Sequence, residues 1–237
     1  MQPLVRTARA TGVFYLGLAI MGGLGFLLIR GQLYVADQPD ATLAHLVDHE
    51  SLARLGVAAE MGVVLTQALA AAWFYRLFRS VDTFAAGCLA AFGLVNAVAI
   101  LVSAALLGTA LDVALDSTLM PAGGAADAVQ LMYLVSGQLW EVGALFFGLW
   151  LVPMGWLVLR SGWMPRPLGW ILVGGGVGYI CSAFLGQLAP DADVVTGALT
   201  LPATVGEIWM VGYLLVRGVN RRALEWPDSA PSTAAAP

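Results

Sequence analysis

The chain has 237 residues, a formal net charge of −4, and a composition that is 59% hydrophobic and only 11% charged. Soluble domains carry about 25% charged residues, so this composition excludes an ordinary soluble domain and indicates a single domain embedded in a lipid bilayer. The basic residues are dispersed along the chain and form no patch, so we expect no nucleic-acid partner.

Six apolar segments predict an all-α fold, a polytopic membrane bundle of six transmembrane helices, since about 20 apolar residues cross the hydrocarbon core. The first follows Arg6 and Arg9 as a signal peptide would, but its length and the lack of a small-residue cleavage site favour a retained helix. The fourth exceeds an upright crossing, so we expect it to tilt, to project beyond the bilayer or to bend at Pro153. The six segments are residues 10–28, 52–77, 84–107, 129–159, 168–188 and 200–216.

The loop after the first segment contains a short amphipathic stretch, Asp40–Glu50. Leucine and valine recur at helical spacing on one face, while His45, Asp48 and His49 face the other way, which predicts a short helix on the membrane interface. His45 and His49 stand four residues apart and can in principle share one metal ion. The stretch lacks the glutamate of an HExxH motif, and an exposed histidine pair on a solvated helix face is the alternative.

The fifth segment carries Gly174, Gly178, Ser182 and Gly186 at four-residue intervals. Small residues on one helix face let two membrane helices approach closely. We therefore predict that this stripe serves helix packing. The run of glycines within it lies inside a membrane span, so it is not a phosphate-binding loop between a strand and a helix.

Arginine placement predicts the orientation, because cytoplasmic loops of membrane proteins are enriched in basic residues. Arginines mark the N-terminal segment, two alternate loops and the C-terminal end, whereas the other loops are acidic and include only Arg30 and Arg54. We therefore expect a membrane protein with both termini in the cytoplasm. Its membrane domain would cover residues 1–220, and the Pro-, Ala- and Ser-rich residues 221–237 would form a disordered cytoplasmic tail.

Three glutamates lie within the apolar segments, where a carboxylate is costly and usually faces the interior of the bundle. Glu60 and Glu141 each precede an arginine at the expected cytoplasmic interface by 19 residues, which places both ~28 Å above that interface. Glu207 precedes Arg217 by ten residues and lies nearer the middle of the bilayer.

Polar residues recur at helical spacing beside these glutamates, in the half of the bilayer expected to face outward. Such stripes on three helices that run in the same direction predict a cavity open to the outside and sealed toward the cytoplasm. Glu60, Glu141 and Glu207 are the candidate groups that bind a proton or a cation, and Gln138, Asn96 and Tyr133 are the candidates that orient a ligand. Alternatively, each glutamate bonds a hydroxyl, an amide or Arg54 and only fixes helix packing.

Three classes of function fit these residues. The leading hypothesis is a protein that binds or transports a small molecule, a proton or a cation through the polar cavity. The second is an intramembrane enzyme that acts on a lipid, with a carboxylate as general base and, in one version, a metal on His45 and His49. The third is a non-catalytic partner or sensor subunit. The residues point to no particular cofactor, and the chain has no GxSxG elbow, phosphate loop or CxxC motif.

Several segments resemble a bacterial family of multi-pass membrane proteins, the domain of unknown function 4386 family. The resemblance extends over most of the chain up to Asn220, and the stretch between Leu107 and Val129 departs from it. It implies a multi-pass bacterial membrane protein, and so a place in the bacterial inner membrane, and it supplies no activity or catalytic residues. The residues that carry it are Arg54-Leu55-Gly56, Tyr75-Arg76-Leu77, Phe146-Phe147-Gly148-Leu149, Arg160-Ser161-Gly162, Pro165, Leu168-Gly169, Gly178-Tyr179, Gly206-Glu207 and Leu214-Leu215-Val216-Arg217-Gly218-Val219-Asn220.

Overall fold

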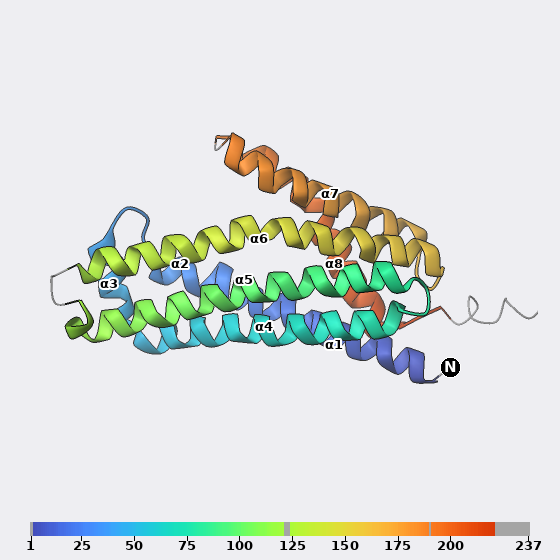
Figure 1. Ribbon diagram of the computed structural model, residues 1–237, viewed down its shortest axis with the longest axis horizontal. Helices are drawn as coiled ribbons and strands as arrows, with labels where there is room; N and C mark the ends of the chain where they lie inside the picture. The colour runs from blue at the N-terminus through green and yellow to red at the C-terminus, as the bar shows by residue number, and fades with distance from the viewer. Residues whose placement is uncertain (1, 121–123, 190, 221–237) are drawn as a thin grey trace, which may run out of the picture.

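The computed structural model describes residues 2–120, 124–189 and 191–220, and within these ranges every regular element is a helix (Figure 1). Six helical segments are long and apolar enough to cross a membrane, which confirms the predicted all-α membrane bundle. Each is longer than the apolar run from which it was predicted. The segments are Pro3–Leu33, Glu50–Phe78, Thr83–Leu115, Ala125–Ser161, Arg166–Leu188 and Asp193–Val216. The tail predicted at 221–237 lies outside the described residues.

The first span changes helix type along its length. An α-helix, α1 (Gln2–Gly22), runs into a π-helical segment, η1 (Gly23–Ile29), and then into a short α-helix, α2 (Arg30–Leu33). Wider π-helical turns are rare and frequently occur at functional sites. Within η1, a Cβ on Gly25 would lie 3.2 Å from the Cβ of Ala59, so the glycine lets this segment approach the second span closely. The wide turns lead directly into Arg30.

The predicted amphipathic stretch forms α3 (Pro39–Asp48), with a proline in its first turn. Its apolar face is inserted into the bundle, where Leu46 is fully buried. The hydroxyl of Thr42 donates a hydrogen bond to Gln130 Oε1 at 2.9 Å, and Gln130 Nε2 donates to the carbonyl of Val35 at 3.1 Å. This pair of bonds fastens the loop and α3 to the fourth span.

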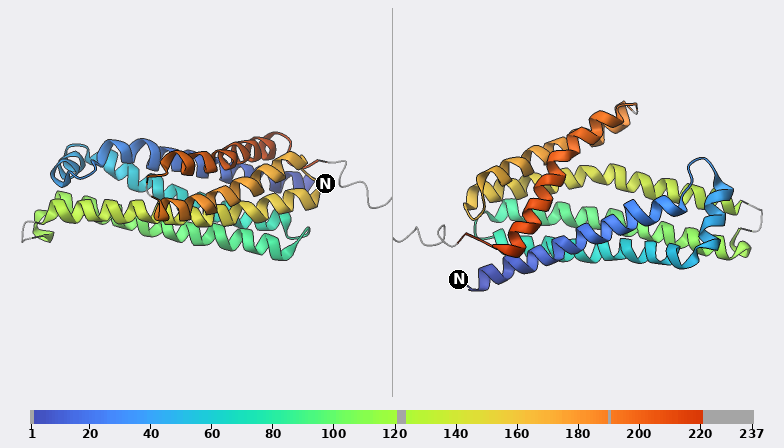
Figure 2. Two further views of the ribbon diagram at one scale, coloured as in Figure 1. Left: turned by 90° about the horizontal axis from the view of Figure 1, so that it is seen from above. Right: turned by 180° about the vertical axis from the view of Figure 1, so that it is seen from behind.

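The remaining spans are α4 (Glu50–Phe78), α5 (Thr83–Leu115), α6 (Ala125–Ser161), α7 (Arg166–Leu188) and α8 (Asp193–Val216). α5 packs against α4 and α6, while α8 packs against α7 and α1. Both described ends of the chain lie at one end of the bundle, which we call the termini end, and α3 marks the other, the α3 end (Figure 1). α7 packs on α6 near the termini end and diverges from it toward the α3 end (Figures 1 and 2).

An aromatic cluster fills the core of the bundle. Phe74 of α4 and Trp150 of α6 are both buried and meet edge to face, with ring centroids 5.4 Å apart. Tyr15 of α1 contacts both rings, at 5.4 Å and 6.0 Å. A Cβ on Gly93 of α5 would lie 2.2 Å from Trp150 Cζ3, so glycine is needed there for the indole to fit. The cluster therefore fixes four spans around one large side chain.

Glycines allow α6 and α7 to touch backbone to backbone. A Cβ on Gly148 would lie 2.6 Å from the carbonyl oxygen of Gly176, and a Cβ on Gly155 would lie 2.5 Å from that of Gly169. The prediction that the small-residue stripe of the fifth span serves packing is confirmed at Gly178 and not at Gly174 or Gly186. Of the predicted stripe, Gly178 meets α8, whereas a Cβ on Gly174 would have nothing within 4 Å.

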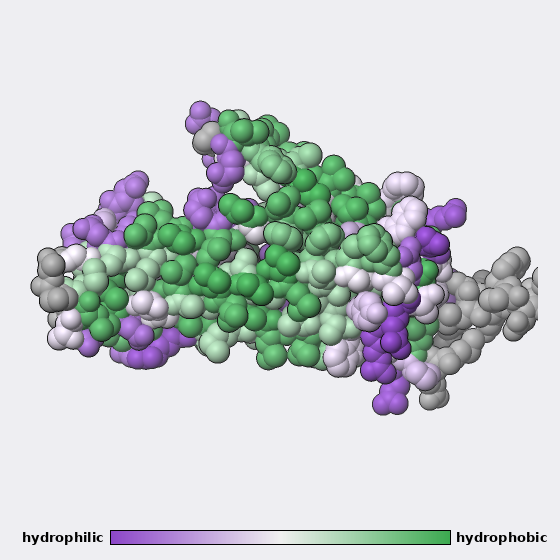
Figure 3. All heavy atoms as spheres, in the orientation of Figure 1, coloured by the Kyte–Doolittle hydropathy of each residue, from purple (hydrophilic) through white to green (hydrophobic). Residues whose placement is uncertain are grey.

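The surface agrees with a bilayer environment. Apolar side chains cover the length of the helices, and hydrophilic ones gather at the two ends of the bundle (Figure 3). Large residues such as Leu27, Phe84 and Ile208 are 70–82% exposed on the membrane-spanning helices, a pattern that water would penalise and lipid accepts. The protein is thus an integral membrane protein with a hydrophobic band around it.

Candidate functional site

A continuous chain of hydrogen bonds joins Arg30 to Glu60 inside the bundle. Arg30 Nη1 donates to Ser136 Oγ at 2.7 Å, the hydroxyls of Ser136 and Ser103 are 2.7 Å apart, and Ser103 Oγ donates to Glu60 Oε2 at 2.7 Å. Trp140 Nε1 donates to the other oxygen of Glu60, Oε1, at 3.1 Å. Four spans contribute to this network, and both oxygens of the carboxylate have donors.

The surroundings of Arg30 suit a buried cation. Its guanidinium also donates to the backbone carbonyl of Tyr133, and its central carbon lies 5.5–6.0 Å from the ring centroids of Phe26, Tyr34 and Tyr133. Aromatic faces attract a cation, most strongly where water is excluded. The arginine and the Glu60 carboxylate therefore balance each other's charge through two serines, and the geometry of Glu60 favours a role in packing.

A second pair of polar side chains lies between α4 and α5. Asn96 Nδ2 of α5 donates to Gln67 Oε1 of α4 at 2.9 Å, and both side chains are 1% exposed. The oxygen of Asn96 is buried and has no partner among the described residues. Gly143 of α6 lies beside this oxygen, since a Cβ on Gly143 would be 3.3 Å from Asn96 Oδ1.

A polar cleft opens where α7 and α8 diverge from α6, and we call it the α7 cleft. Its volume is about 690 Å³, and Glu141 lies on its α6 wall, with Gln138 Nε2 donating to Glu141 Oε2 at 3.0 Å. Neither arginine nor lysine lines this cleft among the described residues. The cleft therefore presents two carboxylates with no basic side chain in its described lining, and Arg30, which lies over the ring of Phe26, interacts with the charge of Glu141 from outside that lining. The polar side chains along it are Glu141, Ser182, Gln187, Asp193, Thr196 and Thr200.

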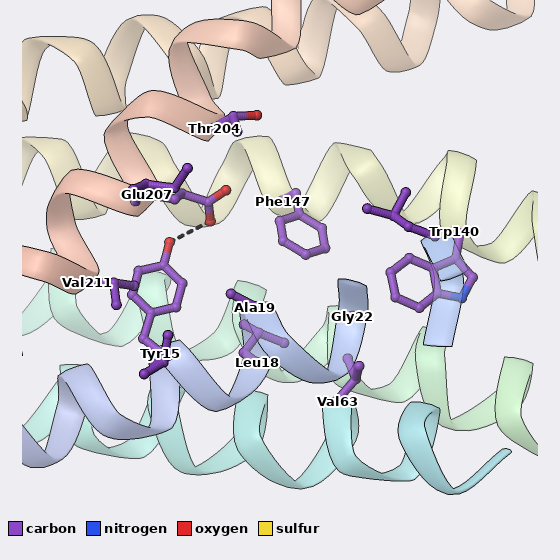
Figure 4. Close-up of a pocket in the computed structure, with 13 residues that line it drawn as sticks. Tyr15, Leu18, Ala19, Gly22, Val63, Trp140, Phe147, Thr204, Glu207 and Val211 are labelled. Carbon is purple, nitrogen blue, oxygen red and sulfur yellow. Dashed lines mark hydrogen bonds between the residues drawn. The ribbon is translucent and has the colours of Figure 1, made fainter. Parts of the chain in front are cut away.

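A second cavity, of about 490 Å³, lies between α1 and α8, and we call it the α1–α8 pocket. Its walls are mostly aliphatic and aromatic, and its main polar feature is a carboxylate–phenol pair. Tyr15 Oη donates to Glu207 Oε1 at 2.5 Å (Figure 4). Phe147 and Trp140 of α6 lie further along the same pocket, so Trp140 connects it to the Glu60 network.

The six side chains proposed from the sequence are thus distributed over three places. Glu60, Tyr133 and Asn96 are buried between helices, at 2%, 3% and 1% exposure. Glu141 and Gln138 are joined by a hydrogen bond at the α7 cleft. Glu207 lies alone among them in the α1–α8 pocket. No hydrogen bond joins two of the three glutamates in the described part of the chain.

His45 of α3 and His49, which directly follows α3, are close, with ring centroids 6.3 Å apart. No group of three or more His, Cys, Asp or Glu side chains that could hold a metal ion occurs within the described residues. Nδ1 of His45 is buried and has no hydrogen-bond partner there. The metal site on His45 and His49 remains a prediction and gains no third ligand from the fold.

The sequence reasoning misses several residues of these sites, among them Arg30 and Tyr15. The apolar run ends near residue 28, which places Arg30 in a loop, yet the helix continues to Leu33. A usable signal is present: Phe26 and Tyr34 stand four residues before and after Arg30, the spacing that places aromatic rings on one helix face beside it. Tyr15 gives no comparable signal, since a single tyrosine in an apolar run is common in membrane helices.

Comparison with known proteins gives one match. A sequence model of a protein family described as "Domain of unknown function (DUF4386)" matches residues 10–218 of the chain. No curated protein and no solved structure matches it.

Proposed function

Because the chain belongs to the DUF4386 family, whose description assigns no activity, we propose a function from its own geometry: it binds a small organic cation in the α7 cleft. The observation that carries this proposal is the presence of both Glu141 and Asp193 in the lining of a cleft whose described lining contains no basic residue. A bound cation would place a positive charge inside the cleft, where the described lining has none.

The size and the walls of the cleft support a small molecule. Its volume of about 690 Å³ falls within the range of small-molecule sites, roughly 300–1,000 Å³. Phe26 and Tyr179 add aromatic surface, which attracts organic cations. Gln138 holds Glu141 by a hydrogen bond from one turn away, so the carboxylate is oriented before a ligand arrives.

The predicted orientation in the membrane indicates from which side a ligand would reach the α7 cleft. With the arginine-rich loops in the cytoplasm, the α3 end faces outward, and the α7 cleft opens on that side of a bacterial inner membrane. The cleft would then be the binding site of a receptor or the outward-facing site of a transporter. Glu60, Asn96 and Tyr133 would act indirectly, by fixing the helices that carry Glu141.

Binding of choline to the purified protein in lipid nanodiscs, measured by calorimetry, tests this proposal. Its neutral isostere 3,3-dimethylbutanol, which has the same shape without the charge, is the control ligand. We expect choline to bind and the isostere to bind at least about tenfold more weakly, since a charge-assisted contact contributes roughly 1.5–3 kcal/mol.

The matched variants are Glu141→Gln with Asp193→Asn, and Asp112→Asn as the control. Asp112 is an exposed carboxylate near the end of α5, outside the cleft lining. The double variant should lose choline binding, and the control should keep it. Equal binding of the two ligands, or full binding by the double variant, would refute the proposal.

A further inference from the structure

The α1–α8 pocket faces the lipid. α1 and α8 meet near the termini end, where a Cβ on Gly12 would lie 2.9 Å from the Cβ of Leu214, and they separate beyond that contact. The rim of the pocket includes Leu16, Leu27 and Ile208, which are 38%, 72% and 70% exposed on membrane-spanning helices. A molecule dissolved in the bilayer can therefore reach the pocket sideways, without passing through water.

The polar end of the pocket is the carboxyl group of Glu207, which forms no ion pair with any described residue. Its described hydrogen bond comes from Tyr15 and engages Oε1, and Figure 4 shows the other oxygen of Glu207 directed away from the phenol. The ion pairs of the described residues are Arg54–Glu50 and Arg160–Asp82, so none involves Glu207. A carboxylate inside a membrane usually pairs with a partner or marks a functional site.

We propose that this pocket binds a single-chain lipophilic amine from the bilayer, with its ammonium group paired to Glu207. The amine supplies the cation that the helices do not provide, and Tyr15 holds the carboxylate in place. The tyrosine ring is itself fixed by Phe74 and Trp150. This site is separate from the α7 cleft and does not depend on the function proposed for that cleft.

The shape of the pocket suits one apolar chain. From Glu207 on α8, the pocket runs past Phe147 and then Trp140, which form its α6 wall (Figure 4). On the α1 wall, the small residues Ala19 and Gly22 leave room for a ligand. A Cβ on Gly22 would have nothing within 4 Å, so the space beside it is open. A chain whose head lies at Glu207 can run past Phe147 toward Trp140 and bury apolar surface along its length.

Photo-crosslinking in nanodiscs tests the proposal, with a dodecylamine that carries a diazirine at the far end of its chain. We expect labelling of α6 near Trp140, mapped by peptide mass spectrometry. Unlabelled dodecylamine should compete, whereas dodecanol should compete at least about tenfold more weakly, because it has no charge to pair with the carboxylate. Equal competition by dodecanol would overturn the assignment of an amine.

Three variants locate the site. Glu207→Gln should reduce labelling by about tenfold or more through loss of the charge pair. Ala19→Leu keeps the carboxylate and fills the pocket, so it should also reduce labelling, which guards against a folding defect in the first variant. Glu141→Gln should leave labelling unchanged, which separates this site from the α7 cleft. Full labelling in Glu207→Gln or in Ala19→Leu would refute the proposal.

The lipid composition distinguishes a free amine from a lipid headgroup. Nanodiscs of phosphatidylcholine alone and nanodiscs that include phosphatidylethanolamine should give equal labelling if the ligand is a single-chain amine. Loss of labelling with phosphatidylethanolamine would assign the site to the ammonium of a two-chain lipid and overturn the single-chain assignment.

Discussion

Arg30 and Glu60 form no direct ion pair within 4.0 Å, yet the hydroxyls of Ser136 and Ser103 join them in one buried network. The arginine comes from the first span, the glutamate from the second and the two serines from the third and fourth, so the network joins four spans. An isolated charge inside a membrane protein is costly, whereas a balanced pair is tolerated. This relationship separates Glu60 from Glu141 and Glu207, which lie at cavities.

Replacement of Glu60 by Gln should destabilise the protein, by about 3–5 kcal/mol, because it leaves the guanidinium of Arg30 without a countercharge. The measurement is unfolding of the detergent-solubilised protein by heat or denaturant. Glu141→Gln is the control and should change stability little, since Glu141 is exposed at the α7 cleft. The double variant Glu60→Gln/Arg30→Gln should recover part of the loss. A Glu60→Gln protein as stable as the wild type would contradict a packing role.

The spans are predictable from the sequence because hydropathy over about 20 residues decides which segments enter a bilayer. The contact of Gln138 with Glu141 can also be predicted from the sequence, since residues three apart share a helix face. The hydrogen-bond partners of Glu60 cannot be predicted in this way, because they depend on how α4, α5 and α6 are rotated against one another. Hydropathy places Arg30 in a loop because its charge ends the apolar run, whereas the helix continues to Leu33 and three aromatic rings lie beside the guanidinium.

The α6–α7 contact makes a prediction about two glycines. Gly148→Ala should destabilise the protein by about 1–3 kcal/mol, because its Cβ would collide with the backbone of Gly176 and overpacking forces the helices apart. Gly174→Ala is the matched control on α7, where a Cβ meets open space, so it should be neutral or slightly stabilising. Thermal unfolding of both variants in the same detergent decides the matter. Equal effects would mean that the two helices do not touch through Gly148.

We expect the protein to lose stability in acid because of Asp82, which lies at the termini end of the bundle. Its pKa lies below the ordinary value because the backbone N–H of Ala85 donates to it at the start of α5 and Arg160 pairs with it at 3.0 Å. A carboxyl whose pKa is depressed by folding stabilises the protein above its unfolded pKa of about 3.9, and this contribution disappears as the pH falls through the folded pKa.

The test for Asp82 is the stability of wild type and Asp82→Asn between pH 7 and pH 3. The free energies of unfolding of the two proteins should differ at neutral pH. The difference should shrink as the pH falls below the ordinary pKa of an aspartate. High salt should reduce the part of the difference due to Arg160, because an exposed ion pair is screened. A constant difference across this pH range would contradict the role of the charged carboxylate.

The hydroxyl of Thr42 should hold α3 against α6. Thr42→Val keeps the size of the side chain but leaves the buried oxygen of Gln130 without its donor, which costs about 1–3 kcal/mol. Since α3 contributes little to the central core, we expect the loss to appear locally, as faster hydrogen exchange over Pro39–Asp48. The control is Thr109→Val, whose exposed hydroxyl bonds only the carbonyl of Ala105 in its own helix. Unchanged exchange in α3 would show that apolar burial of Leu46 alone fixes this helix, and that its polar contacts to α6 are dispensable.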